Sequence, residues 1–111
     1  MDTRIKINQP KEFVTRLVLG YFDPLHASHI RRLQELCSNG ERISIGIMDP
    51  PDPILPLRAR AELLAGLAIV DRVYEAPDLH QLAPAQVIDE RSADLERAGE
   101  LAAHVVNRNR Q

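Results

Sequence analysis

The feature that most constrains the fold of this 111-residue chain is the stretch 17–33, where a short apolar run leads through a polar loop into helical periodicity. Residues 17–19 form a run too short and too apolar for a half-exposed strand, so they predict a buried one. From Ser28 onward, apolar side chains recur at the spacing of one helix face. These side chains are Ile30, Leu33, Leu36 and Cys37. The stretch therefore predicts a buried strand, a tight loop and a helix start in direct succession.

The loop between these two elements has the composition of an anion site. Gly20 ends the predicted strand and supplies the conformational freedom that a backbone turning close to a ligand requires. A loop that enters a helix points backbone N–H groups and the positive end of the helix dipole at one spot, which suits a phosphate. His26 and His29 add two donors at the helix entrance. We expect both histidines to contact phosphate.

Two other interpretations of the histidine pair stay open. A spacing of three residues at a helix start also suits two metal ligands, joined by Asp23 or Asp49. Either histidine could instead be a structural or surface residue. The order of glycine, loop, aspartate and helix start favours phosphate contact, so the sequence predicts no metal site held by these residues.

The rest of the chain alternates between strand and helix patterns. Strands are predicted around residues 42–48, 71–74 and 86–89, and helices over 56–68 and from Ser92 onward. Strands alternating with helices at this spacing imply a parallel sheet with right-handed crossovers. The predicted fold is a small doubly wound, Rossmann-like α/β domain with three α/β/α layers and a parallel sheet of about four strands.

This single α/β domain is expected to span residues 17–111. The polar leader before it, residues 1–16, is expected to add at most an edge segment around residues 5–7. In an open parallel sheet, ligands bind at the carboxyl ends of the strands. At that edge the loop 20–29 would meet Asp49, which closes the second strand.

Charged residues mark the starts of two predicted helices. Arg58 and Arg60 begin one of them, where the dipole disfavours cations; a bound anion is one explanation, and a solvated pair of arginines is the other. In the last helix, Asp94 and Glu96 fall in the first turn and favour the dipole. Leu95 begins the face of that helix that we expect to be buried.

Composition excludes several other classes of protein. The net charge of -2 gives no general attraction to nucleic acid or to an anionic membrane. The single cysteine, Cys37, rules out an intramolecular disulfide and a thiolate metal cluster. There is no signal-peptide pattern and no apolar stretch close to the roughly 20 residues that span a membrane. A cytoplasmic protein is therefore expected.

The loop sequence GYFDPLHASH resembles the G-x-F-D-x-x-H-x-G-H element of the cytidylyltransferase-like nucleotidyltransferases. That superfamily includes glycerol-3-phosphate cytidylyltransferase, phosphocholine cytidylyltransferase and the heptose-phosphate adenylyltransferases. The matching residues are Gly20, Phe22, Asp23, His26 and His29, and Ser28 stands where the family usually has glycine. The similarity continues to Asn39-Gly40 and the next strand, and resumes over 56–64. It covers roughly half of the chain.

The resemblance implies transfer of a cytidylyl or adenylyl group from CTP or ATP, with Mg²⁺, to a small phosphorylated alcohol or sugar, releasing pyrophosphate. Because the acceptor phosphate is the nucleophile, no side-chain base is required. His26 and His29 would be the catalytic residues, stabilising charge on the transferring group. Nucleotide or phosphate binding would fall to Gly20, Tyr21, Phe22, Ser28 and Arg60, and substrate positioning to Asp23, Asp49 and Arg58.

Two of these residues have alternatives that stay open. Asp23 could contact the acceptor, hold the loop, or hydrogen-bond its own turn. Phe22 could be a core residue or a stacking platform for the base.

The chain also departs from the family pattern. The late R-x-x-G-I-S-T-T-like turn has no counterpart after Val87, and Arg91 is the only nearby cation that could substitute for it. No lysine follows Lys11, although family members commonly place one near the substrate phosphate. A non-catalytic nucleotide-binding or assembly module is therefore the alternative to an enzyme. A third possibility is a homodimer in which a neighbouring subunit completes the site.

Overall fold

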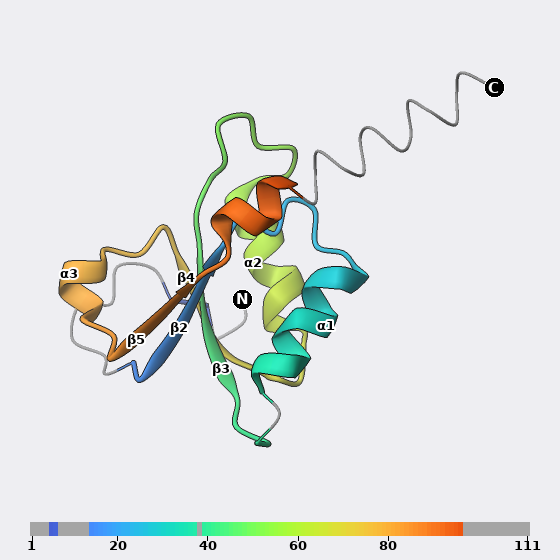
Figure 1. Ribbon diagram of the computed structural model, residues 1–111. Coiled ribbons are helices and arrows are strands. Elements are labelled where there is room, and N and C mark those ends of the chain that lie inside the picture. Colours follow the sequence, from blue (N-terminus) through green and yellow to red (C-terminus); the bar gives the residue numbers. More distant parts are fainter. Residues whose placement is uncertain (1–4, 7–13, 38, 97–111) are drawn as a thin grey trace.

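A computed structural model describes residues 5–6, 14–37 and 39–96, which form strands alternating with helices (Figure 1). The strands are β1 (Ile5–Lys6), β2 (Arg16–Gly20), β3 (Ile43–Ile47), β4 (Val70–Glu75) and β5 (Gln86–Asp89). The helices are α1 (Ala27–Leu36), α2 (Leu57–Ala65) and the short α3 (Leu79–Leu82). Residues 91–96 are also helical.

The strands form one parallel sheet in the order β1-β4-β3-β2-β5. β2 is an interior strand, because Leu17 lies opposite Ser44 of β3 on one side and Val87 of β5 on the other. A parallel strand next to its neighbour requires a crossover connection, and here α1 and α2 provide two of them. The predicted Rossmann-like α/β fold is confirmed.

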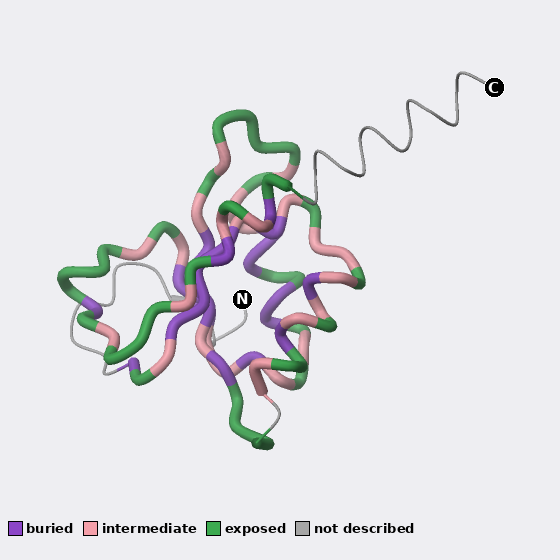
Figure 2. The backbone as a smooth tube through the Cα atoms, in the orientation of Figure 1, coloured by how far each residue is buried: buried purple, intermediate pink, exposed green. Residues whose placement is uncertain are grey.

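Apolar side chains from alternate positions of the strands pack on the two faces of the sheet. On the face covered by α1 and α2, Val18 packs in one cluster with Leu33 and Leu64. On the opposite face, Leu17 packs in a second cluster with Leu82 of α3. The buried backbone in Figure 2 follows the sheet and the inner sides of α1 and α2. Three layers result, as the alternation of strand and helix patterns predicted.

The four predicted strands are present, and the edge segment expected in the leader is confirmed as β1, which pairs with β4. The division between leader and domain at residue 16 stays a prediction. The helix α3 was not predicted, because a four-residue helix is too short to show a periodic apolar face. Among the described residues, no helix has the length and apolar character needed to cross a membrane.

The prediction for the last helix was partly wrong. Helical structure begins at Arg91, one residue before the expected cap Ser92. Leu95, which was expected to be buried, is 48% exposed, whereas Asp94 is only 6% exposed. The other residues expected on that buried face, between 98 and 106, lie outside the described part of the chain. The helix therefore turns a carboxylate inward.

Candidate active site

The loop 20–29 leaves the carboxyl end of the interior strand β2 and enters α1 at the N-cap residue His26. Asp49 follows β3 at the same edge, and a proline-rich connector, residues 50–56, leads from there to α2. A backbone hydrogen bond joins the two segments at this edge: the Met48 N–H donates to the Gly20 carbonyl oxygen at 3.0 Å. The structure thus brings the predicted loop and Asp49 to one edge of the sheet.

His29 lies inside this edge, 3% exposed, and both of its ring nitrogens have protein partners. Nδ1 accepts a hydrogen bond from the backbone N–H of His26 at 3.2 Å. Nε2 lies 2.9 Å from Oδ1 of Asp94. A nitrogen that accepts from an N–H carries no proton, so we assign the proton to Nε2, which donates it to Asp94. His29 is a buried residue with a defined tautomer.

Asp94 joins the helical segment after β5 to the loop after β2. Its second oxygen, Oδ2, accepts the backbone N–H of Tyr21 at 2.8 Å. Gly20 is needed beside it, because an added Cβ would lie 2.7 Å from Asp94 Oδ2 and 2.5 Å from the Phe22 ring. Sequence reasoning missed this role of Asp94 and assigned its charge only to the helix dipole.

His26 is oriented by its neighbours at the start of α1. Its Nδ1 lies 2.6 Å from the hydroxyl oxygen of Ser28. Its ring centroid is 4.1 Å from that of His29, with the planes tilted by 46°. Ser28 stands where the resembling loops usually have glycine. Its hydroxyl therefore contacts the His26 ring directly.

Phe22 is a core residue. Its side chain is 2% exposed, and its ring centroid lies 5.2 Å from that of His29. The backbone at Phe22 adopts a positive φ of 49°, which turns the chain from β2 toward α1. Of the two alternatives for this residue, burial among side chains favours the core over a stacking platform.

Asp23 binds a different loop from its own. Its carboxylate accepts the backbone N–H groups of Ile54 at 2.6 Å and Leu55 at 2.8 Å, and its side chain is 3% exposed. Of the three roles left open by the sequence, this geometry favours holding a loop, and the loop held is the proline-rich connector.

Arg60 is fully buried and joins the same segments. Its guanidinium donates to the carbonyl oxygens of Leu55 at 3.1 Å, Tyr21 at 2.8 Å and Met48 at 3.0 Å, and forms an ion pair with Asp49. Four bonds from one side chain fix the loop after β2, the end of β3 and the connector relative to one another.

Arg58, whose side chain is 30% exposed, pairs with Glu75 at the end of β4, with 2.7 Å between Nε and Oε1. The solvated alternative is wrong for Arg60, because its side chain is fully buried. For Arg58 both alternatives stay predictions.

The described residues contain no group of three or more histidine, cysteine, aspartate or glutamate side chains placed to hold a metal ion. Asp49 is 55% exposed and uses one oxygen for Arg60, whereas both oxygens of Asp23 accept backbone N–H groups. Mg²⁺ is commonly held by one or two carboxylates together with substrate phosphates. These side chains fit an ion that arrives with a polyphosphate better than a resident one.

The family model for cytidylyltransferase-like proteins matches residues 17–107, which includes every predicted site residue. The chain belongs to this family. The match begins at β2 and therefore covers the whole described sheet except β1.

Three similar proteins bear the name bifunctional protein HldE. The protein from Alkalilimnicola ehrlichii is 38% identical over 63 residues, covering 49% of this chain and 13% of the relative. The protein from Shewanella piezotolerans gives the same values, and that from Pseudomonas entomophila is 35% identical over 68 residues, covering 53% of this chain and 14% of its own length. The cytidylyltransferase-like chain thus corresponds to a small part of these relatives.

The cation that could replace the missing late turn of cytidylyltransferase-like proteins has a partner in this chain. Arg91 Nη2 lies 2.7 Å from Oδ2 of Asp89 at the end of β5. This bond is the main cause that lowers the pKa of Asp89 and raises the pKa of Arg91. A ligand that used Arg91 would have to compete with Asp89.

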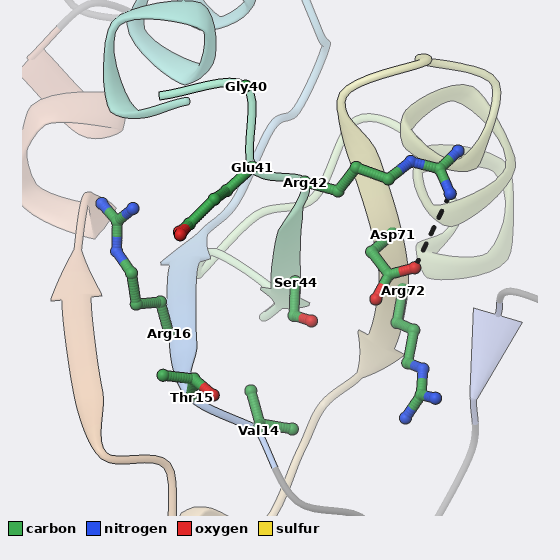
Figure 3. Close-up of a pocket in the computed structure, with 9 residues that line it drawn as sticks. All are labelled: Val14, Thr15, Arg16, Gly40, Glu41, Arg42, Ser44, Asp71 and Arg72. Atoms are coloured by element: carbon green, nitrogen blue, oxygen red, sulfur yellow. Dashed lines mark ion pairs between the residues drawn. The ribbon is translucent and has the colours of Figure 1, made fainter. Parts of the chain in front are cut away.

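A separate cavity of about 650 Å³ lies at the other end of the cytidylyltransferase-like sheet (Figure 3). It is lined by the starts of β2, β3 and β4, with Arg16, Arg42 and Arg72 among its residues. The three guanidinium groups point in different directions, and Arg42 pairs with Asp71 at 3.9 Å. None of the predicted site residues lines this cavity, so it is distinct from the candidate active site.

Proposed function

We propose that this protein transfers a cytidylyl or adenylyl group from CTP or ATP to a small phosphorylated alcohol or sugar and releases pyrophosphate. The observation that carries the proposal is the histidine loop 20–29 at the carboxyl end of the interior strand β2, in a chain of the cytidylyltransferase-like family. In sheets of this kind, that edge is where ligands bind. The helix that follows adds its positive end toward an anion.

In this proposal, His26 is the residue that contacts the transferring phosphate most directly, with its ring oriented by Ser28. His29 would orient His26 through the hydrogen bond from its backbone N–H and the close approach of the two rings, and would offer its Nε2 proton to the phosphates. The acceptor phosphate is the nucleophile, so catalysis consists of positioning and charge stabilisation.

The remaining predicted residues would shape and charge the site. Arg60 and Asp23 would order the loops rather than touch the nucleotide, because their polar atoms are bonded within the protein. Asp49 has an exposed carboxylate and would face the substrates, and the backbone of 20–22 would line the phosphate path. Arg58 would act at the outer rim, next to Glu75.

Mg²⁺ bound to the triphosphate would neutralise part of its charge. Asp49 is the described carboxylate best placed to help hold it, since its side chain is half exposed at the end of β3. A homodimer that completes the site and a cytoplasmic location remain predictions from the sequence.

A non-catalytic nucleotide-binding or assembly module is the second candidate. The ion pair between Arg91 and Asp89 favours it, because the cation nearest to the lost late turn is already neutralised. A module of this kind would keep the fold without turnover.

Calorimetric titration with Mg²⁺-ATP and Mg²⁺-CTP tests the proposal, followed by pyrophosphate release with glycerol 3-phosphate and sugar phosphates as acceptors. His26→Ala should abolish saturable binding of the preferred nucleotide. His80→Ala, at an exposed histidine of α3, is the matched control and should bind as the natural protein does. Binding without pyrophosphate release by any acceptor would favour the non-catalytic module. Binding that His26→Ala leaves unchanged would exclude the histidine loop as the site.

A further inference from the structure

The carboxylate of Asp94 accepts hydrogen bonds from two donors near the start of α1. One is the backbone N–H of Tyr21, at 2.8 Å from Oδ2, and the other is His29 Nε2, at 2.9 Å from Oδ1. Both belong to the loop proposed to bind phosphate. They are fixed on separate elements, one after β2 and one in α1, and converge on a single anion.

The space next to Gly20 is also taken. An atom added at the Cβ position of Gly20 would lie 2.7 Å from Asp94 Oδ2 and 2.8 Å from Cζ of Phe22. The close approach to the backbone that glycine permits is therefore used by side chains of the same chain. With Asp94 only 6% exposed, the carboxylate is an integral part of this arrangement.

We infer that Asp94 is an internal competitor for the phosphate site, so that the described conformation is an autoinhibited one. This inference rests on the proposed function, because it takes the competing ligand to be a polyphosphate. A phosphate group cannot share the Tyr21 and His29 donors with a carboxylate, since two adjacent anions in a buried site repel each other. The helical segment 91–96 must therefore withdraw Asp94 before the polyphosphate reaches both donors.

A site that is open in only a fraction of molecules binds its ligand more weakly by that same fraction. Removal of the carboxylate should therefore strengthen polyphosphate binding. A carboxylate that merely positioned His29 for the ligand would give the opposite sign, because its loss would release the His29 ring. The sign of the change in affinity separates the two roles.

The test uses the full chain, with inorganic tripolyphosphate as the probe and calorimetry as the readout. Tripolyphosphate carries no base, so the result does not depend on nucleotide preference or turnover. We expect Asp94→Ala to bind it about tenfold more tightly than the natural protein does, as for a site open in one molecule in ten. The matched control is Glu62→Ala, at an exposed carboxylate of α2; its affinity should not change.

Amide and imidazole NMR signals locate the binding. In Asp94→Ala, tripolyphosphate should shift the Tyr21 amide and the His29 Nε2 signals at lower concentration than in the natural protein. Equal or weaker binding by a folded Asp94→Ala variant would overturn the inference, as would tighter binding that leaves these two signals unmoved.

If Asp94→Ala does not fold, Asp94→Asn decides by the same criteria. The amide keeps the side-chain volume but offers one acceptor oxygen in place of two, so it cannot satisfy both donors. Tighter tripolyphosphate binding without nucleotidyl transfer would reject the proposed function and leave this inference standing. Transfer activity that falls in Asp94→Ala together with tripolyphosphate affinity would reject this inference and leave the proposed function standing.

Discussion

The guanidinium of Arg60 donates to the carbonyl oxygen of Tyr21 at 2.8 Å, across 39 residues of sequence and with the Arg60 side chain fully buried. The same group reaches carbonyl oxygens of Met48 and Leu55. These contacts make one side chain of α2 the point at which three loop segments are joined. The geometry of the site therefore depends on the Arg60 side chain.

Arg60→Leu should therefore destabilise the protein strongly, by about 3–5 kcal/mol, because it leaves three partly buried carbonyl groups and the Asp49 carboxylate without their donor. Urea unfolding followed by circular dichroism measures the change. Arg42→Leu is the control, since the Arg42 side chain is 56% exposed and its ion pair is long at 3.9 Å. That variant should stay within about 0.5 kcal/mol of the natural protein.

Gly20→Ala should cost about 1–3 kcal/mol, because its Cβ would lie 2.5 Å from the Phe22 ring in a closely packed region. Thermal unfolding provides the measurement. Gly66→Ala is the matched control, since the nearest atom to its added Cβ is the Leu63 carbonyl oxygen at 3.4 Å, and its backbone is already helical. Equal stability of the two variants would show that the loop relaxes around the methyl group.

Asp23→Asn should loosen the proline-rich connector without unfolding the domain. The carboxylate accepts two backbone N–H groups, from Ile54 and Leu55, whereas an amide offers one acceptor oxygen. Hydrogen exchange at these two amides should accelerate by about tenfold, as expected from the loss of roughly 1.4 kcal/mol of local stability. Asp52→Asn, at an exposed position of the same connector, should leave their exchange unchanged. Unaltered exchange in Asp23→Asn would contradict the assigned role.

Acid titration should reveal the bond between Asp89 and Arg91. The hydrogen bond from Arg91 lowers the pKa of Asp89 below its ordinary value of 3.8. Because the folded pKa is the lower one, this contribution to stability is present above pH 3.8 and is lost as the pH falls through the folded pKa. NMR titration of the Asp89 carboxyl should give a midpoint below 3.8, and Arg91→Ala should raise it. An identical midpoint in both proteins would show that the bond does not persist in solution.

Local sequence patterns were sufficient to predict the strands β2 to β5 and the loop 20–29 at the carboxyl edge of the sheet. Short-range periodicity and turn composition determine these elements, so they are readable from a single chain. The partners of the site residues, in contrast, lie far from them in the sequence. His29 and Asp94 lie 65 residues apart, and Asp23 binds backbone groups of the connector 31 and 32 residues away.

Such contacts could not be predicted, because the local sequence around a carboxylate in the first turn of a helix does not differ between one that faces solvent and one that faces a buried histidine. Leu95 shows that apolar periodicity alone is also insufficient to predict which side chain is buried. Its periodicity placed it on a buried face, but the helix is rotated so that Asp94 points inward instead. A pairing between a buried polar side chain and a distant partner outweighed the local apolar pattern.

The loop-holding bonds of Asp23 are made to main-chain atoms, and so are three of the four bonds described for Arg60. The side chains of the residues whose backbone atoms bind Asp23 or Arg60 can therefore be exchanged without loss of these bonds. Ile54, whose side chain is 72% exposed, is such a position, and Tyr21 is another. This separation allows the surface around the loop to diversify by mutation while its backbone frame is retained, and it makes these positions a natural starting point for engineering altered ligand preference.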